Sequence, residues 1–348
     1  MPTDINKPWE QSLGQFLEEV VSRDPGKTFI EIGGQSRSYR EFYDGVLKSA
    51  AMFSQLGIQK GDRVCLFLPN CIEYVYSWFG LSVIGAISVP VNTAYKRDEM
   101  AYILNNAEAK GLVTDPTLAD VAGAAADQAP SVQVKLIRGD AEDVLEGWTD
   151  FAVEHKASDP LQVLPKISPY DISMLVYTSG TTGNPKGVLY SHRSTVLHAM
   201  LSLSRDTFDI HSGATLLLVV PMFHANAWGT PYSAAMVGAK LVLPGPHLDG
   251  ESVYELMRDE RVTIMQGVPT VWLMLFGYLD QHPEIEVVAT QAADWDASKA
   301  QAITSTILKF TSYSWSSFHS LNPVFIYSRI RGSVTSPSSS EIPPSMRR

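Results

Sequence analysis

The 348-residue sequence predicts an α/β fold in which layered, mostly parallel sheets are covered by helices. Its first half alternates segments of helical period with short apolar runs, an alternation typical of parallel sheets. The apolar runs are free of charge and bounded by turn residues, as buried strands are. The composition, 45% hydrophobic and 18% charged, is ordinary for a globular protein, and the length allows two or three domains.

The order of elements follows from local signals. Ser38-Tyr-Arg-Glu41 has the form of a capping box, which predicts a helix that begins here and ends near Gly57. Residues 156–170 contain three prolines and no clear period, which predicts a connector. Further helices are predicted over residues 73–83, 98–107, 192–203, 252–259 and 269–279, and strands over 64–68, 86–91, 112–114, 132–137, 172–177, 215–220, 236–243 and 263–266.

Composition divides the chain into three expected parts. Residues 1–170 form an N-terminal α/β subdomain, and residues 171–285 form a second α/β subdomain that carries the site described below. Residues 286–348 form a divergent tail, with twelve serines from Thr311 to the end. Such serine-rich tracts bury too little apolar surface to offset the entropy of ordering, so we expect this tail to be poorly ordered.

Several classes of protein are disfavoured by simple counts. The net charge of -10 gives no basic footprint for nucleic acid or for an acidic membrane. Tyr74 to Tyr95 is uncharged over 22 residues, but serines and Pro90 interrupt it, which favours a helix and then a strand over a membrane span. Cys65 and Cys71 are expected to be buried free thiols. They favour a reducing compartment, and the absence of a secretory signal favours the cytoplasm.

One segment carries most of the functional information. An apolar run, Ile172 to Tyr177, leads into a loop of hydroxyls and glycines that Lys186 closes. Glycines here, Gly187 among them, can turn successive N–H groups into one concavity, hydroxyls add donors, and lysine adds a mobile charge suited to phosphate. The segment therefore predicts a phosphate-binding loop made of Thr178, Ser179, Gly180, Thr181, Thr182, Gly183 and Lys186.

The loop differs from the two commonest phosphate-binding motifs. Pro185 stands where a Walker loop needs its second glycine, and the spacing of the glycines does not fit the dinucleotide fingerprint. The residues alone leave open that this is a polar surface loop.

The stretch Tyr177-Thr-Ser-Gly-Thr-Thr-Gly-Asn-Pro-Lys186-Gly-Val resembles the signature loop of the acyl-adenylate-forming enzymes. This superfamily holds fatty-acyl-CoA synthetases, luciferases and the adenylation domains of peptide synthetases. A second stretch, Pro221-Met-Phe-His224-Ala-Asn-Ala-Trp228-Gly229, resembles the family segment beside the acyl group, and Gln266-Gly-Val-Pro-Thr270 resembles a loop that borders the acyl pocket. The resemblance covers roughly residues 10–285, most of the family's large N-terminal region, truncated before its C-terminal lid domain.

The resemblance implies an AMP-forming acyl-CoA synthetase that uses ATP, Mg²⁺ and CoA on a carboxylic acid, with medium- or long-chain fatty acids expected first. The loop would hold the β- and γ-phosphates of ATP. His224 would be the catalytic and substrate-binding residue next to the substrate carboxylate, and Trp228 and Gly229 would shape the acyl channel. From the residues alone, the alternative for His224 is a core-edge histidine after a strand.

The sequence departs from the family after residue 285. We find there no aromatic-Gly-x-Thr-Glu element for Mg²⁺, no Thr-Gly-Asp element for ribose and no lid lysine, so no metal ligand is assigned. His192 and His198 are six apart, which does not suit one helical face or a metal site. The tail is expected to be a truncation or a gene-model or frameshift product. A non-catalytic remnant that binds a phosphate, an acyl ligand or a partner without turnover stays open, as does the oligomeric state.

Overall fold

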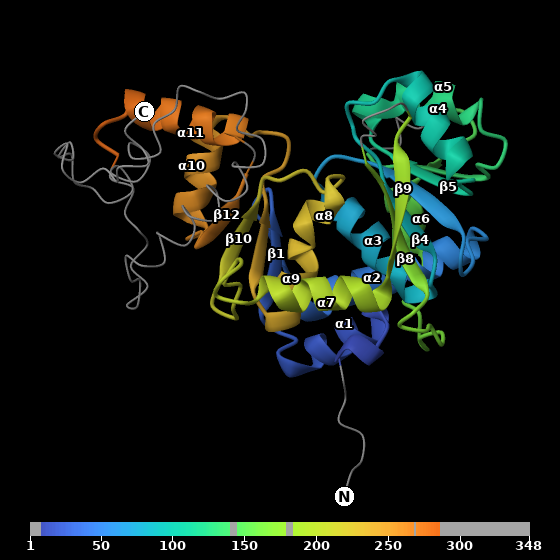
Figure 1. The fold of residues 1–348 in the computed structure, drawn as a ribbon, viewed down its shortest axis with the longest axis horizontal. Coiled ribbons are helices and arrows are strands. Elements are labelled where there is room, and N and C mark those ends of the chain that lie inside the picture. The colour runs from blue at the N-terminus through green and yellow to red at the C-terminus, as the bar shows by residue number, and fades with distance from the viewer. Residues whose placement is uncertain (1–7, 140–144, 179–183, 268, 286–348) are drawn as a thin grey trace, which may run out of the picture.

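The computed structural model describes residues 8–139, 145–178, 184–267 and 269–285, and these residues build two sheets (Figure 1). In the seven-stranded sheet every neighbouring pair is parallel except the last, which is an antiparallel hairpin. Its order is β7 (Thr149–Asp150), β6 (Val134–Ile137), β5 (Gly111–Thr114), β3 (Arg63–Phe67), β4 (Ile87–Pro90), β8 (Ile172–Thr178) and β9 (Lys186–Ser191).

The five-stranded sheet is also parallel except for one edge hairpin, β1 with β2. Its order is β12 (Ile264–Gln266), β10 (Thr215–Leu218), β11 (Lys240–Leu243), β1 (Thr28–Ile32) and β2 (Gln35–Ser38). The predicted fold class, mostly parallel sheets covered by helices, is therefore confirmed. The sheets do not follow the expected division at residue 170, because β8 and β9 complete the seven-stranded sheet while β1 and β2 belong to the five-stranded one.

Helices form layers between and outside the sheets, and Figure 1 shows α3 and α9 lying between them. The central layer contains α1 (Leu13–Arg23), α2 (Tyr39–Gln55), α3 (Ile72–Ile84), α7 (His192–Ser202) and α9 (Thr230–Val237). The outer faces are covered by α4 (Arg97–Asn106) and α5 (Ala119–Ala126) on the seven-stranded sheet, and by α10 (Gly250–Asp259) and α11 (Pro269–Gln281) on the other. Shorter elements are η1 (Pro8–Glu10), η2 (Pro116–Leu118), α6 (Phe151–Ala157) and α8 (Ala225–Trp228).

Burial on both faces explains why the strands read as continuous apolar runs. In β3, Val64 and Leu66 point into the central cluster, whereas Cys65 and Phe67 point into the cluster beneath α4 and α5. Cys65 and Cys71 are both buried and unpaired, as predicted, and burial raises the pKa of each thiol above its ordinary range. Both are therefore poor nucleophiles.

The local signals that predicted α2 and α3 are confirmed. At the start of α2 the Ser38 hydroxyl accepts from the Glu41 N–H (3.2 Å), and the Glu41 carboxylate accepts from the Ser38 N–H (2.8 Å). The uncharged stretch after residue 73 is α3 followed by β4, with Gly85 ending the helix at φ +73°. Within the described part of the chain, no helix is long and apolar enough to cross a membrane.

One predicted strand is wrong in its first half. The run predicted over 236–243 begins with the last two residues of α9, turns at Gly238 (φ +77°), and is a strand only over Lys240–Leu243. Pro231 opens that short helix and Gly238 closes it. The elements that were not predicted are α1, β1, β2, α5, β7, α6, β9, α8, α9 and the two 3₁₀ turns, η1 and η2. The expected tail, 286–348, lies outside the described residues.

Candidate functional site

The candidate site lies where the carboxyl ends of strands from both sheets meet. Asn70, which follows β3, donates from Nδ2 to the carbonyl oxygens of Leu218 and Val220, both at 2.9 Å, and its Oδ1 accepts from the N–H of Met222 at 2.7 Å. One side chain thus bonds the end of β3 in the seven-stranded sheet to the end of β10 in the five-stranded sheet. In open α/β sheets, ligands bind in the crevice outside these strand ends.

The predicted phosphate loop is the connection of the β8–β9 hairpin. Thr178 and Lys186 are paired across it, both side chains are exposed, and the Thr178 hydroxyl donates to the Lys186 carbonyl oxygen at 3.4 Å. Within the described residues, no carboxylate lies at ion-pair distance from Lys186, so its charge is available to a ligand. The rest of the predicted loop lies outside the described residues: Ser179, Gly180, Thr181, Thr182 and Gly183.

Helix α4 braces the base of this hairpin. The Tyr102 hydroxyl donates to the Pro185 carbonyl oxygen at 3.1 Å, and the Tyr177 hydroxyl donates to Oδ1 of Asn106 at 2.7 Å. Burial raises the pKa of Tyr177 to about 12, so the hydroxyl keeps its proton and remains a donor at neutral pH. The two ends of the loop are therefore fixed by contacts to a helix on the outer face of the sheet.

The expected role of Gly187 as a turn glycine is wrong. Gly187 lies in β9 opposite Tyr177 and is not among the glycines with positive φ. A Cβ at this position would come within 2.7 Å of Leu175 Cδ1 on the facing strand. The glycine therefore serves close packing within the hairpin.

The second motif forms a short loop after β10. His224 is exposed, and its backbone N–H donates to the Pro221 carbonyl oxygen at 3.0 Å. An exposed side chain does not fit the alternative of a histidine packed at the edge of the core. The role of His224 beside a substrate carboxylate stays a prediction.

The backbone immediately after His224 is left-handed. Asn226, Ala227, Trp228 and Gly229 have φ of +51°, +48°, +57° and +71° in succession, so α8 is not an ordinary helical turn. Left-handed backbone costs a residue with a Cβ roughly 1–2 kcal/mol, and it persists only where surrounding contacts impose it.

Those contacts come from three elements. The buried Asn226 accepts at Oδ1 from the Tyr74 hydroxyl of α3 (3.2 Å), and its Nδ2 contacts the sulfur of Met174 on β8. His198 of α7 donates from Nε2 to the Trp228 carbonyl oxygen at 2.9 Å. The Asn226 contact to Met174 places the loop after β10 directly against β8, the strand that leads into the predicted phosphate loop.

Trp228 and Gly229 are arranged by α7 and its neighbourhood. The half-buried Trp228 ring stacks on Phe208 with ring centroids 6.3 Å apart. A Cβ on Gly229 would lie 2.9 Å from His198 Cδ2, so glycine permits both the left-handed backbone and the approach of the helix. Their role in an acyl channel stays a prediction.

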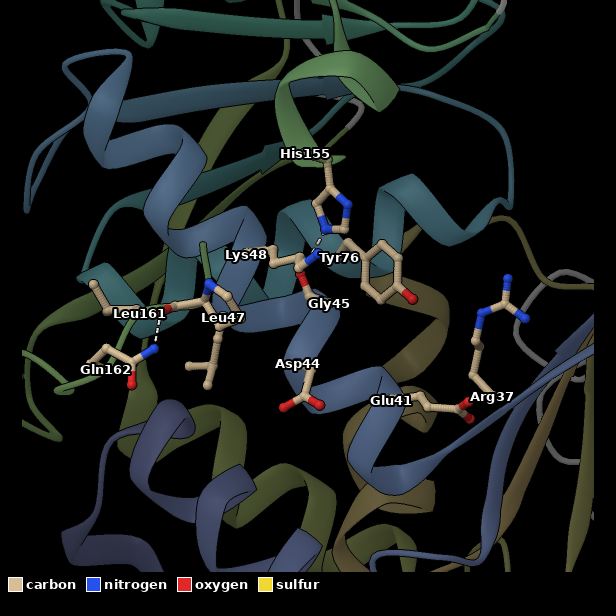
Figure 2. Close-up of a pocket in the computed structure, with 11 residues that line it drawn as sticks. Arg37, Glu41, Asp44, Gly45, Leu47, Lys48, Tyr76, His155, Leu161 and Gln162 are labelled. Carbon is tan, nitrogen blue, oxygen red and sulfur yellow. Dashed lines mark hydrogen bonds between the residues drawn. The ribbon is translucent and has the colours of Figure 1, made fainter. Parts of the chain in front are cut away.

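A separate cavity of about 650 Å³ lies against α2 and α3 (Figure 2). His155 projects into this region, stacks on Tyr76 at 5.1 Å, and bonds through Nε2 to the Gly45 carbonyl oxygen at 2.8 Å. Burial lowers the pKa of His155, which keeps the ring neutral at pH 7. The lining carries charges of both signs and none of the predicted site residues, and it does not define a ligand class.

Comparison with known proteins identifies the family. The sequence model described as AMP-binding enzyme matches residues 17–328. The chain belongs to the AMP-binding enzyme family. The match extends past residue 285, where the resemblance was expected to end, to residue 328.

Two curated relatives of this AMP-binding enzyme are fatty-acid ligases. The medium-chain-fatty-acid–CoA ligase of Ectopseudomonas oleovorans is 36% identical over 304 residues, which cover 85% of this chain and 53% of the relative. The long-chain-fatty-acid–CoA ligase of Thermus thermophilus is 38% identical over 283 residues, which cover 78% of this chain and 50% of the relative. This chain therefore spans about half the length of the curated relatives it matches.

A solved structure agrees with this assignment to the AMP-binding enzymes. The Mycobacterium tuberculosis fatty acyl CoA synthetase superposes with a TM-score of 0.70 at 26% identity, over 80% of this chain and 53% of that chain. The layered, mostly parallel fold is thus shared with a solved structure that is similarly longer.

Sequence reasoning assigned no site role to several residues that shape the loop after β10. Asn70, Tyr74, Asn226 and His198 make the contacts that shape the loop after β10. Asn226 stood within the motif Pro221 to Gly229. Asn70 and Tyr74 stood within Leu68 to Tyr74, a stretch that also resembles the family but was interpreted as structural.

Proposed function

We propose that this chain carries the ATP-phosphate loop and the acyl-binding wall of an AMP-forming acyl-CoA ligase that acts on medium- or long-chain fatty acids. In this reaction a carboxylate oxygen attacks the α-phosphorus of ATP and displaces diphosphate. The thiol of CoA then attacks the acyl carbonyl carbon, loses its proton and displaces AMP. The observation that carries the proposal is the contact of Asn226 with Met174, because it brings the His224 loop against the strand that ends at the phosphate loop.

The described part of the phosphate loop suits an anion. Lys186 offers an exposed ammonium group and Thr178 an exposed hydroxyl across the hairpin, with no described carboxylate paired to the lysine. A lysine charge and hydroxyl donors are the usual partners of phosphate oxygens. We assign the β- and γ-phosphates of ATP to this loop.

Mg²⁺ and CoA enter the proposal through the family reaction. No group of three or more His, Cys, Asp or Glu among the described residues could hold a metal ion. Mg²⁺ that travels with ATP needs only one or two protein carboxylates, since phosphates and water supply its other ligands, and it would neutralise phosphate charge. No step of the proposal is assigned to a metal ligand of this chain.

The loop after β10 suits an apolar carboxylic acid. Between Thr215 and Gly238 the sequence contains no charged residue, so nothing there would pair with the ammonium group of an amino acid. Ala227 is buried, Trp228 is half-buried, and His224 is exposed at the start of the turn. In the proposal, His224 meets the substrate carboxylate, and Trp228 and Gly229 border the alkyl chain.

The compartment is inferred from the cysteines. Cys65 and Cys71 are buried and unpaired, which supports a reducing compartment such as the cytoplasm.

Isothermal titration of the full chain with diphosphate and with straight-chain acids tests the proposal. We expect diphosphate to bind, and affinity to rise from butanoate to dodecanoate by about fourfold per methylene, because burying one methylene contributes about 0.8 kcal/mol. Equal affinities along the acid series, or no binding of diphosphate, would contradict it. ATP–diphosphate isotope exchange with dodecanoate then separates adenylation from binding without turnover.

A further inference from the structure

The turn after His224 has a conformation that most sequences avoid. Four residues in a row, Asn226 to Gly229, are left-handed, and three of them carry a Cβ. Asparagine enters this region more readily than most residues, and glycine enters it at no cost. Because glycine would adopt this backbone more easily, conformational preference alone does not explain asparagine here. The asparagine side chain must therefore contribute contacts that glycine would lack.

Both polar atoms of that side chain are engaged in the interior. Asn226 is 1% exposed, Tyr74 is fully buried, and the Tyr74 hydroxyl donates to Asn226 Oδ1 at 3.2 Å. Nδ2 contacts the sulfur of Met174, four residues before the end of β8. The amide thus ties the turn to α3 on one side and to the phosphate-loop strand on the other.

The other end of the same loop is held independently. Asn70 bonds to Leu218, Val220 and Met222, which precede His224. His224 and Trp228 therefore lie on a segment that side-chain hydrogen bonds hold on both sides. Of the residues that hold it, Asn226 is the only one whose side chain reaches β8 among the described contacts.

We propose that Asn226 is a positioning residue of the acyl-binding loop: its buried amide, held between Tyr74 and Met174, sets the placement of His224 and Trp228 relative to the end of β8. This inference rests on the proposed acyl-CoA ligase function. Asn226 is buried and touches no substrate in this account; it acts through the residues on either side of it. Its loss changes fatty-acid binding and leaves the affinity of the phosphate loop for diphosphate unchanged.

The test uses the full chain labelled with 5-fluorotryptophan and followed by ¹⁹F NMR. The Trp228 signal is assigned by its absence in Trp228→Phe. Asn226→Gly keeps the left-handed backbone and removes the amide, and Tyr74→Phe removes only the hydroxyl that donates to it. Tyr232→Phe is the matched control, because Tyr232 is equally buried and its hydroxyl, the group removed, contacts Ser82 and not the loop.

We expect Asn226→Gly and Tyr74→Phe to shift or broaden the Trp228 signal without ligand. Decanoate affinity should fall by about fivefold, the factor that corresponds to one hydrogen bond of ordinary strength. Diphosphate affinity should stay within about twofold of the wild type in both, because Lys186 and Thr178 are unchanged. Tyr232→Phe should leave the Trp228 signal and decanoate affinity as in the wild type while lowering thermal stability.

An unchanged Trp228 signal together with unchanged decanoate affinity in both variants would overturn the inference. If Asn226→Gly does not fold, Tyr74→Phe alone decides. A wild-type chain that binds no fatty acid would refute the proposed function, and the Trp228 signal would then decide the inference alone: a shift supports it and no shift overturns it. If Asn226→Gly and Tyr74→Phe change the Trp228 signal and the decanoate affinity only as much as Tyr232→Phe does, then Asn226 contributes to stability alone. That result would also overturn the inference.

Discussion

His192, the first residue of α7, makes stability depend on pH in the acid range. Its side chain is fully buried, and Nδ1 accepts a hydrogen bond from the backbone N–H of Leu13 in α1 at 3.2 Å. Its Nε2 has no hydrogen-bond partner among the described residues. A protonated ring would put a donor against the Leu13 N–H and a charge into the core, so the folded state favours the neutral ring.

The size of the effect follows from the shifted pKa. Burial lowers the pKa of His192 from 6.5 to about 4, against an opposing effect of Asp171 and a smaller lowering by Lys60. The unfolded chain then binds more protons than the folded chain between these values, so stability falls as the pH falls. From about pH 7.5 to about pH 5 this one group removes about 2 kcal/mol from the free energy of unfolding.

Replacing His192 by Asn separates this effect from the general loss of stability in acid. Asparagine can offer an oxygen to the Leu13 N–H and does not titrate. Urea unfolding at both pH values should show that the wild type loses about 2 kcal/mol more than His192→Asn. His247→Asn, at an exposed site, should behave as the wild type. Equal losses in the wild type and His192→Asn would refute the reasoning.

Three other predictions follow from the site and the sheet edge. Lys186→Ala should weaken diphosphate binding by about tenfold or more in isothermal titration, as expected for the loss of a charge-assisted contact. The control Lys166→Ala, at an exposed lysine of the connector, should leave diphosphate affinity unchanged, and equal affinities in the wild type and Lys186→Ala would remove Lys186 from the site. Mass spectrometry of the chain alone with ATP, Mg²⁺, CoA and fatty acids should detect no acyl-CoA, because its sequence offers no candidate for the Mg²⁺ carboxylate or the lid lysine. Ready formation of acyl-CoA would contradict this and would place these groups within residues 286–348. Leu189→Lys should reduce aggregation measured by light scattering, because Leu189 is 59% exposed on the edge strand β9; an unchanged result would mean that this edge is not the adhesive surface.

The parts of the fold that could be predicted are those with a local signal. The capping box at Ser38 predicted α2. The charge-free runs predicted β3 and β8, because buried parallel strands need no polar face. The strand prediction over residues 236–243 was partly wrong because this apolar run joins the end of α9 to β11. Periodicity cannot separate helix from strand in so short a stretch. The β1–β2 hairpin was missed although Gly33 and Gly34, both with positive φ, form its two-residue turn.

The site could be predicted only where a motif named it. The motifs gave Thr178, Lys186 and His224, but no local pattern indicates that Asn70 bonds to Leu218, 148 residues away, or that Tyr74 bonds to Asn226, 152 residues away. These pairings exist because strand ends from two sheets meet. These pairings depend on the tertiary arrangement of the two sheets, which local patterns in a single sequence do not predict.

Two residues that follow β3 hold the loop after β10, the proposed acyl-binding loop, in place. Asn70 holds that loop before His224, and Tyr74 holds it after His224 through Asn226. Asn70 lies in the connection between β3 and α3, and Tyr74 lies in the first turn of α3, so both follow β3 of the seven-stranded sheet, which also carries the predicted phosphate loop at the end of β8. The proposed acyl-binding loop therefore continues a strand of the five-stranded sheet but is held by residues that follow a strand of the seven-stranded one.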